Sequence, residues 1–153
     1  MTVHQQAFFH AATFTVTYLV WDDATKVAAV IDPVLDYAPA SAKVSTGSAD
    51  TVLAAAKDLG LTLQYVLETH AHADHLSAAD HIRRATGATV VIGAHIGEVQ
   101  AHFAPLFEAV DVVPDGSAFG RLVADGDVLD LGETPIRVMH TPGHTAACGT
   151  YLI

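Results

Sequence analysis

The sequence predicts a layered α/β fold with mixed sheets, and three observations support this prediction. Strand-like and helix-like segments alternate in the first part of the chain, whereas short strand-like segments predominate in the second part. The 153 residues, of which 51% are hydrophobic, suffice for one domain with a real core. No internal repeat or low-complexity tract suggests a repetitive architecture. We therefore expect residues 1–153 to belong to one domain.

The N-terminal segments predict strands. Residues 8–21 are rich in Thr, Val, Tyr and Phe and partly alternate between apolar and polar positions, which is typical of a strand. A turn at residues 22–25 would pair this strand in a hairpin with the short apolar strand 26–31, which Asp32 and Pro33 end. Residues 36–48 are rich in Pro, Ser and Gly, so we expect no regular structure there.

Three helices are expected in the middle of the chain. Residues 48–59 carry an N-terminal Ser and Asp that can cap a helix, and Gly60 can end it. Residues 76–86 are followed by Gly87 in the same way, and residues 95–107 form a third helical segment with a proline near its end. The remaining strands are expected at residues 63–69, 89–92, 128–130, 135–139 and 148–153.

Charge and composition argue against several classes of protein. Seven Lys and Arg residues against 17 Asp and Glu residues give a net charge of −10, the wrong sign for a nucleic-acid-binding surface. The apolar stretches are shorter than the ~20 residues that a membrane helix needs. A signal peptide has basic residues before its apolar stretch, whereas no basic residue precedes the first apolar stretch here. The lone Cys148 cannot form an internal disulfide and is expected to pack in a strand. We expect a soluble cytoplasmic protein.

Residues 70–75, which read His-Ala-His-Ala-Asp-His, predict a metal site. In an extended segment His70 and His72 point the same way, whereas Asp74 and His75 can diverge around the following turn. One pair of side chains can therefore serve one metal position and the other pair a second position. Imidazole and carboxylate ligands suit zinc, iron and related divalent ions.

A second segment supplies a further ligand. Pro142 and Gly143 predict a tight turn after a strand, and this turn would present His144 toward the site as a ligand from distant sequence. The other six histidines have no ligand spacing among themselves, and we expect them to be packed or solvated. Asp32 is expected to cap the Pro33 turn, with a hydrogen bond that braces the metal site as the alternative. Tyr37 either packs or reaches the substrate.

The chain ends inside an apolar segment. Residues 151–153 have no turn or polar tail after them, and such a strand edge would expose unpaired backbone groups. We therefore expect the natural polypeptide to continue beyond residue 153, so that the domain is incomplete at its C-terminus.

Residues 70–75 resemble the HxHxDH signature of the metallo-β-lactamase superfamily, and residues 141–145 resemble its later histidine motif. This resemblance implies an αββα sandwich, of which the chain would form the N-terminal half to two-thirds. Longer strings resemble bacterial persulfide dioxygenases and the related β-lactamase-like hydrolases; they are residues 68–79, 31–37, 92–93 with 98–100, and 140–145 with Cys148.

The resemblance implies a persulfide dioxygenase that oxidises glutathione persulfide to sulfite with O2. One Fe(2+) would be held by His70 and His144, with His72, Asp74 and His75 lining the site. Asp74 is the only carboxylate in residues 70–75 and 141–145, so it is our candidate for a catalytic role. The family's own aspartate ligand and its final histidine come from a C-terminal part beyond residue 153. The implied partner is a small-molecule thiol, and the resemblance also suggests a homodimer.

Two alternatives stay open. In a thioester hydrolase of the glyoxalase II type, two zinc or iron ions would activate a water molecule. His70, His72 and His144 would then bind one metal, and Asp74 and His75 the other. The persulfide dioxygenase and the thioester hydrolase would use the same side chains, so the motifs do not distinguish these two enzymes. The third possibility is a non-catalytic fragment or half-domain that needs a partner.

Overall fold

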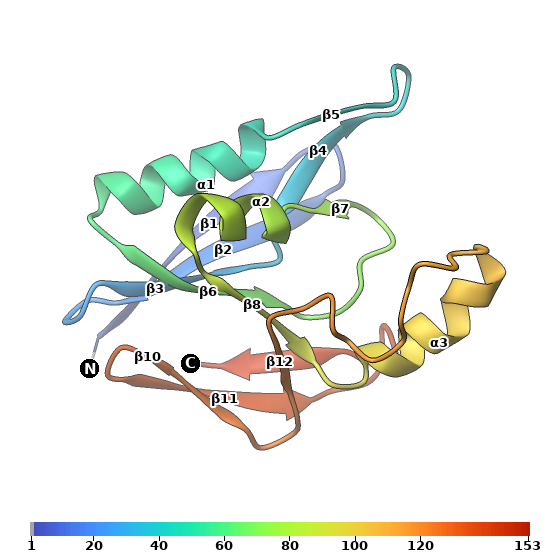
Figure 1. The fold of residues 1–153 in the computed structure, drawn as a ribbon. Coiled ribbons are helices and arrows are strands. Elements are labelled where there is room, and N and C mark those ends of the chain that lie inside the picture. Colours follow the sequence, from blue (N-terminus) through green and yellow to red (C-terminus); the bar gives the residue numbers. More distant parts are fainter. Residues whose placement is uncertain (1) are drawn as a thin grey trace.

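The computed structural model describes residues 2–153 and contains two packed sheets with two helices on one side (Figure 1). The large sheet has six strands in the order β1-β2-β3-β6-β8-β9, which are β1 (Val3–His10), β2 (Thr15–Asp22), β3 (Val27–Ile31), β6 (Thr62–Glu68), β8 (Thr89–Gly93) and β9 (Arg121–Val123). The small sheet is antiparallel and consists of β10 (Val128–Leu131), β11 (Thr134–His140) and β12 (Gly149–Leu152). A third set of short strands comprises β4 (Val34–Ala38), β5 (Lys43–Ser45) and β7 (Leu76–Ser77). The helices are α1 (Gly47–Asp58), α2 (Ala79–Thr86) and α3 (Ile96–Leu106).

The centre of the large sheet is parallel and buried on both faces. β3, β6 and β8 run parallel to one another, and their apolar side chains are buried whichever way they point. The helices α1 and α2 provide the crossover connections that parallel strands require. This arrangement confirms the predicted layered α/β fold with a mixed sheet.

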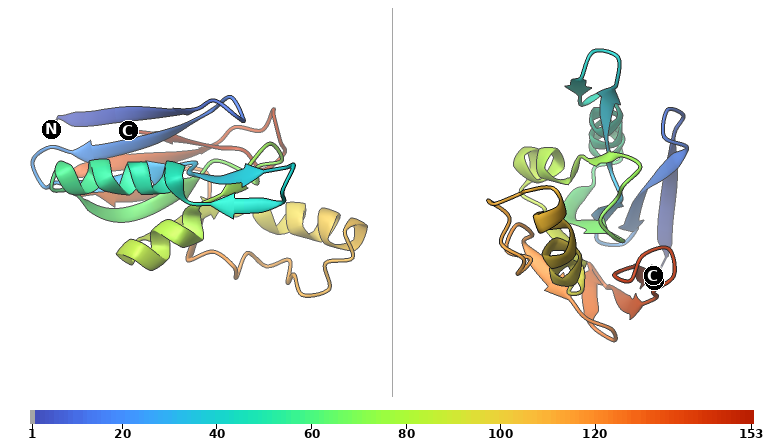
Figure 2. Two further views of the ribbon diagram at one scale, coloured as in Figure 1. Left: turned by 90° about the horizontal axis from the view of Figure 1, so that it is seen from above. Right: turned by 90° about the vertical axis from the view of Figure 1, so that its right-hand side faces the viewer.

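Two hydrophobic cores separate three layers. In the first core, Val52 and Ile82 of the helices pack against residues of the large sheet such as Val66. In the second core, Leu67 packs among side chains of the small sheet such as Ile136. β10 and β11 alternate between buried and exposed residues because only one of their faces is covered. The layers are therefore helix, sheet and sheet, the first three of an αββα sandwich (Figure 2).

Several predicted boundaries were wrong. Residues 8–21 are not one strand, because a turn at residues 11–14 separates β1 from β2, and Phe14 there has a φ of 57°. Residues 36–48 are not irregular, because β4 and β5 form a hairpin. The second helix begins at Ala79 rather than residue 76, because β7 first pairs with β4. The short strand β9 was not predicted.

The cap of α1 also differs from the expectation. The helix begins after Thr46, whose side chain makes no cap hydrogen bond with the backbone. Ser48 instead donates its hydroxyl to Asp36 Oδ1 at 2.6 Å, and its backbone N–H to Asp36 Oδ2 at 2.8 Å. Ser48, one of the two residues that were expected to cap the helix, therefore ties the start of α1 to β4.

The two ends of the described chain and the helix α3 lie at opposite ends of the molecule. The first described residues and the C-terminal end of β12 lie near each other, whereas α3 projects from the opposite end of the molecule (Figures 1 and 2). Ile96 is the only residue of α3 that is buried.

None of the helices formed by residues 2–153 combines the length and apolar character needed to cross a membrane.

Candidate metal centre

Four of the five predicted metal ligands lie beyond the carboxyl end of a central parallel strand, where α/β folds commonly place their sites, whereas His144 lies between β11 and β12 of the small sheet. Asp32 follows β3 directly, and residues 70–75 form the loop that follows β6. This loop precedes the short strand β7, which pairs with β4. Both ends of the histidine-rich loop are therefore anchored in sheets.

Backbone hydrogen bonds bring the distant His144 to this loop. The segment 141–148 is closed at its base by a hydrogen bond from Thr141 N to the Cys148 carbonyl at 2.9 Å. Gly149 N, at the start of β12, donates to the Thr69 carbonyl at 2.8 Å, which ties the segment to the residue before His70. The imidazole rings of His70 and His144 consequently lie with their centroids 4.8 Å apart and nearly perpendicular.

Two residues that were not predicted as ligands support the same segment. Cys148 is buried, and its Sγ accepts a hydrogen bond from the backbone N–H of Thr145 at 3.1 Å. His140 makes a hydrogen bond through Nε2 to the Ala146 carbonyl at 2.9 Å, and its ring stacks on that of His95 with centroids 4.1 Å apart. Packing around the turn, rather than proline and glycine alone, therefore positions His144.

Asp32 is a hydrogen-bond acceptor for the histidine loop. Its carboxylate accepts from Thr69 N at 2.8 Å, from Thr69 Oγ1 at 2.7 Å and from His72 Nε2 at 3.1 Å. Burial alone would raise the pKa of Asp32, but the hydrogen bonds from His72 and Thr69 outweigh it and lower the pKa. Its φ of 48° is one that Asp tolerates better than most residues. We had expected Asp32 to cap the Pro33 turn. Its carboxylate instead braces the histidine loop, which was the alternative expectation.

The hydrogen bonds around Thr69 determine which nitrogen of His70 is free. Thr69 has one hydroxyl proton, which it donates to Asp32, because a carboxylate can only accept. Its oxygen, 2.8 Å from His70 Nδ1, must then accept a proton from that nitrogen. The lone pair of His70 therefore lies on Nε2, which is buried and has no hydrogen-bond partner among the described residues. Burial and the neighbouring His72 also lower the pKa of His70, which favours the neutral ligand form.

His72 uses its two ring nitrogens in the opposite way, because Nε2 rather than Nδ1 faces the supporting residues. Its Nε2 lies 3.1 Å from Asp32 Oδ1 and 3.2 Å from Glu68 Oε2, so this nitrogen is the donor. Burial would lower the pKa of His72, but the two carboxylates outweigh it and raise the pKa to about 10 without metal. Nδ1 is left facing Asp74 Oδ1 at 3.9 Å, so a metal would bind His72 through Nδ1.

Glu68 is a buried carboxylate that sequence reasoning missed. It is the last residue of β6 and is 3% exposed, and burial raises its pKa. Ser77 donates its hydroxyl to Glu68 Oε1, whereas Oε2 has only the poorly aligned contact with His72. An acidic residue at the end of an apolar strand, immediately before a histidine cluster, was the signal that could have identified it.

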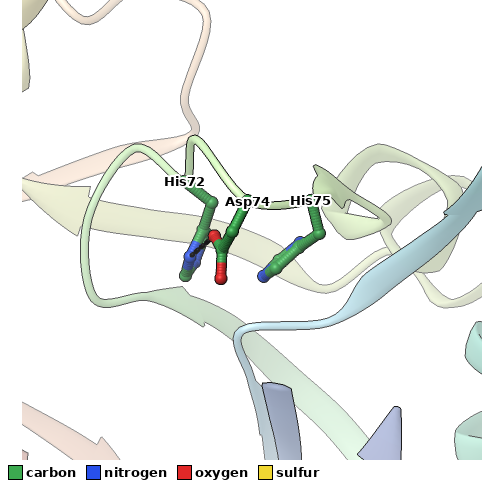
Figure 3. Close-up of side chains that lie close together, drawn as sticks. All are labelled: His72, Asp74 and His75. Carbon is green, nitrogen blue, oxygen red and sulfur yellow. Dashed lines mark ion pairs between the residues drawn. The ribbon is translucent and has the colours of Figure 1, made fainter. Parts of the chain in front are cut away.

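The predicted ligands form a continuous row rather than one compact cluster. The ring of His70 is 4.1 Å from that of His72, and the ring of His72 is 4.2 Å from that of His75. Ligand atoms of His72, Asp74 and His75 lie within 4.8 Å of one another, on one side of the loop (Figure 3). His70 and His144 form the other end of the row.

This row can accommodate two neighbouring cation positions. His70 and His144 offer imidazole ligands at one position, and His72, Asp74 and His75 offer two imidazoles and a carboxylate at the other. The partnerless Nε2 of His70 and, after a metal has displaced its proton, Nδ1 of His72 are the atoms that a divalent metal would engage. The donor set thus fits zinc or iron.

Comparisons with known proteins agree with this geometry. Residues 11–153 match the family model of the metallo-β-lactamase superfamily. A protein of Burkholderia pseudomallei named as a probable metallo-hydrolase is 48% identical over 100% of this chain and 52% of its own length. The human mitochondrial persulfide dioxygenase ETHE1 is 28% identical over 95% of this chain and 46% of its own length.

A solved structure is similar over the same range. The crystal structure of ETHE1 from Myxococcus xanthus superposes with a TM-score of 0.73 and 32% identity, and the match covers 97% of this chain and 53% of that one. The chain therefore spans about half the length of these relatives. The family match, the HxHxDH loop and the supporting carboxylates lead to one conclusion: the chain belongs to the metallo-β-lactamase superfamily.

Proposed function

We propose that the chain provides the metal-binding half of a persulfide dioxygenase that acts on a small-molecule persulfide such as glutathione persulfide. The observation that supports this proposal most is the buried, partnerless Nε2 of His70 beside the ring of His144. Two imidazoles at one position resemble the histidine part of the 2-His-1-carboxylate site that non-haem Fe(2+) enzymes use. The similarity to the ETHE1 proteins supports the same assignment.

In this proposal each side chain has a separate task. His70 and His144 hold the Fe(2+), which supplies the capacity to bring O2 and a sulfur compound together. Asp32 and Thr69 hold the ring of His70 in the tautomer that leaves Nε2 free. Asp74 is half-exposed at the mouth of the loop, where its carboxylate can accept a proton or orient a bound substrate.

A metal-dependent thioester hydrolase is the second candidate. The His72, Asp74 and His75 group favours it, because this group supplies a second cation position beside the first. The similarity to a probable metallo-hydrolase from Burkholderia pseudomallei supports it as well. In such an enzyme Asp74 would be a metal ligand, and the pair of cations would serve to activate water.

Metal stoichiometry and substrate turnover separate the two candidates. The chain is loaded anaerobically with Fe(2+) and, separately, with Zn(2+), and the metal per chain is measured by elemental analysis. The dioxygenase proposal expects one iron per chain, and it expects any O2 uptake by the chain to depend on glutathione persulfide. Two metals per chain, with hydrolysis of a glutathione thioester and no O2 uptake, would support the hydrolase instead.

A further inference from the structure

A hydroxyl, an imidazole and a carboxylate form a hydrogen-bonded chain at the turn between β1 and β2. Thr13 Oγ1 lies 2.6 Å from His10 Nδ1, and His10 Nε2 lies 3.1 Å from Asp36 Oδ1. His10 ends β1, Thr13 is in the turn, and Asp36 is on β4, which this turn approaches (Figure 1). None of the three belongs to the proposed metal centre. Groups in this order activate the nucleophile of Ser-His-Asp hydrolases.

The positions of the protons in this chain follow from the carboxylate. Burial would raise the pKa of Asp36, but hydrogen bonds from Ser48 and His10 lower the pKa, so the carboxylate is ionised and only accepts. His10 Nε2 must then donate, and the lone pair of the neutral ring lies on Nδ1. Thr13 donates to this lone pair, and Thr15 Oγ1 at 2.7 Å can in turn donate to the Thr13 oxygen. The Thr13 hydroxyl is therefore bonded to a base that can remove its proton.

Both ends of the chain are held in place. Asp36 accepts hydrogen bonds from the hydroxyl of Ser48 at 2.6 Å and from its backbone N–H at 2.8 Å. At the other end, Phe14 directly follows Thr13 and has a φ of 57°, which is unfavourable for a bulky residue. Backbone strain of this kind is frequent beside reactive groups, where it fixes the position of a side chain.

Thr13 lines a cavity of about 390 Å³, a volume in the range of small-molecule binding sites. Leu35, Tyr37 and Pro39 give the cavity apolar surface, and residues 72–75 of the histidine loop line it as well. Among the described residues that line this cavity no Lys or Arg occurs. A phosphate or sulfate ester would thus lose its hydration without a cationic partner, in a chain of net charge −10. An uncharged ester of a carboxylic acid fits this lining better.

We propose that Thr13 is the nucleophile of a second, metal-independent site that hydrolyses small uncharged carboxylic esters. The inference goes beyond the proposed function and does not rest on it. Thr13 Oγ1 forms a bond to the acyl carbon while His10 Nδ1 takes the hydroxyl proton, and the bond from that carbon to the leaving oxygen breaks. The leaving oxygen then takes the proton from His10. Asp36 is a positioning residue, because it holds the ring with Nδ1 toward Thr13.

A water molecule completes the reaction. His10 takes a proton from the water while the water oxygen forms a bond to the acyl carbon. The bond from Thr13 Oγ1 to that carbon breaks, and the proton passes from His10 to Thr13. The products are a carboxylic acid and an alcohol, and the two side chains return to their initial state.

Acetylation by p-nitrophenyl acetate, with a chelator present, tests the inference on the wild-type chain. The reaction is stopped with acid during turnover, and peptide mass spectrometry locates the acetyl groups. Acetyl is expected on Thr13 about 100-fold faster than on Ser41, because general-base catalysis acts on Thr13 alone. Ser41 is the internal control, since its exposed hydroxyl lies 3.5 Å from the Ala38 carbonyl and has no imidazole partner among the described residues.

Variants separate the roles of the hydroxyl and the base. His10→Gln keeps a hydrogen-bonding side chain but removes the base, so acetylation of Thr13 should slow about 100-fold. Release of p-nitrophenolate should fall to background in Thr13→Val and persist in Thr13→Ser. His4→Gln is the matched control, because His4 lies on the same strand, 4.0 Å from Asp23, without a hydroxyl partner among the described residues. The thermal midpoint verifies that each variant is folded.

Several outcomes would overturn the inference. One is equal acetylation of Thr13 and Ser41 in the wild-type chain, which no folding defect can explain. A second is turnover that persists in Thr13→Val but not in His10→Gln, because the imidazole itself would then be the nucleophile. A third is hydrolysis that occurs only without the chelator, which would assign it to the metal centre. Metal content and O2 uptake test the proposed function separately, so either can fail without the other.

Discussion

At the scale of single residues, Thr69 connects the carboxylate of Asp32 to the ring of His70. Its hydroxyl donates to Asp32 Oδ2 at 2.7 Å and lies 2.8 Å from His70 Nδ1. Thr69→Val keeps the shape of the side chain but removes both contacts, so His70 loses the restraint on its tautomer and orientation. We expect the affinity for Zn(2+) to fall about tenfold or more, measured by competition with a chromophoric chelator.

Thr69→Ser is the matched control for this prediction. It restores a hydroxyl at the same position and should recover most of the affinity. Wild-type affinity in the valine variant would show that the hydroxyl does not prepare His70 for a metal. The thermal midpoint of each metal-free variant reveals whether a loss of affinity merely reflects a loss of folding.

Asp36 provides a pH-dependent contribution to stability away from the metal centre. Burial would raise the pKa of Asp36, but hydrogen bonds from Ser48 and His10 outweigh it and lower the pKa. A carboxyl group whose pKa is lowered by folding stabilises the protein above its ordinary pKa near 3.8, and this stabilisation is lost as the pH falls through the folded value. In urea unfolding, wild type should therefore be more stable than Asp36→Asn at pH 6, and this difference should shrink toward pH 3. A difference that stays constant between these pH values would contradict the assignment.

The candidate site was only partly predictable at this scale. His70, His72, Asp74 and His75 are close in sequence, so their spacing alone indicated a metal site. Asp32 and Glu68 lie at the ends of neighbouring parallel strands, and only the sheet brings both carboxylates to His72. A contact between neighbouring strands leaves no local sequence pattern, which is why bracing by Asp32 was only the alternative expectation. Glu68 was missed although it immediately precedes the histidine cluster.

At the scale of elements, the turn between β10 and β11 packs against the turn after β2. Gly132 has a φ of 63°, and a Cβ there would collide with Thr25 Oγ1 and lie 2.8 Å from Asp22 Oδ2. Asp22 meanwhile accepts a hydrogen bond from Glu133 N at 2.8 Å, so the two turns cannot easily separate. Gly132→Ala is expected to lower the free energy of unfolding by about 3 kcal/mol, from backbone strain plus the steric clash.

Gly60→Ala is the matched control for this turn. Gly60 has a similar φ of 68°, but a Cβ there would meet nothing within 4 Å. Its substitution should cost only the backbone term of about 1 kcal/mol. Both values come from urea unfolding, and equal losses in the two variants would show that the contact between the turns contributes nothing.

Buried strands were predicted from the sequence more successfully than exposed strands. β3, β6 and β8 were predicted correctly, because runs of buried apolar residues identify central strands. β5 is three exposed residues, so no hydrophobic pattern marks it, and it forms only because β4 lies beside it. The turn at residues 11–14 was missed because it runs directly into the alternating Thr-rich stretch 13–17, which has high strand propensity. Side-chain hydrogen bonds between His10 and Thr13 and between Thr13 and Thr15 nevertheless stabilise a turn.

At the scale of the whole molecule, we expect metal binding and folding to be coupled. His70 and His144 come from segments that meet only when β12 joins β11 and Gly149 bonds to Thr69. A ligand that binds the folded state alone adds RT ln(1 + [L]/Kd), which is ~2.7 kcal/mol at a hundredfold excess over Kd. The thermal midpoint of the chain should therefore rise by several degrees with Zn(2+) and return to its original value after chelation. A midpoint that is unaffected by Zn(2+) would contradict this coupling.

The central claim is that the histidine loop and the distant His144 form one metal centre, and the affinity of the His144→Ala variant for Zn(2+) tests it most directly. His81→Ala is the control, because His81 lies on α2, pairs with Asp50 at 2.8 Å and has no role in the centre. Measured by competition titration, the affinity should fall at least about tenfold in His144→Ala and remain at the wild-type value in His81→Ala. If the two variants and wild type bind Zn(2+) equally tightly, His144 is not a ligand and the proposed centre is wrong.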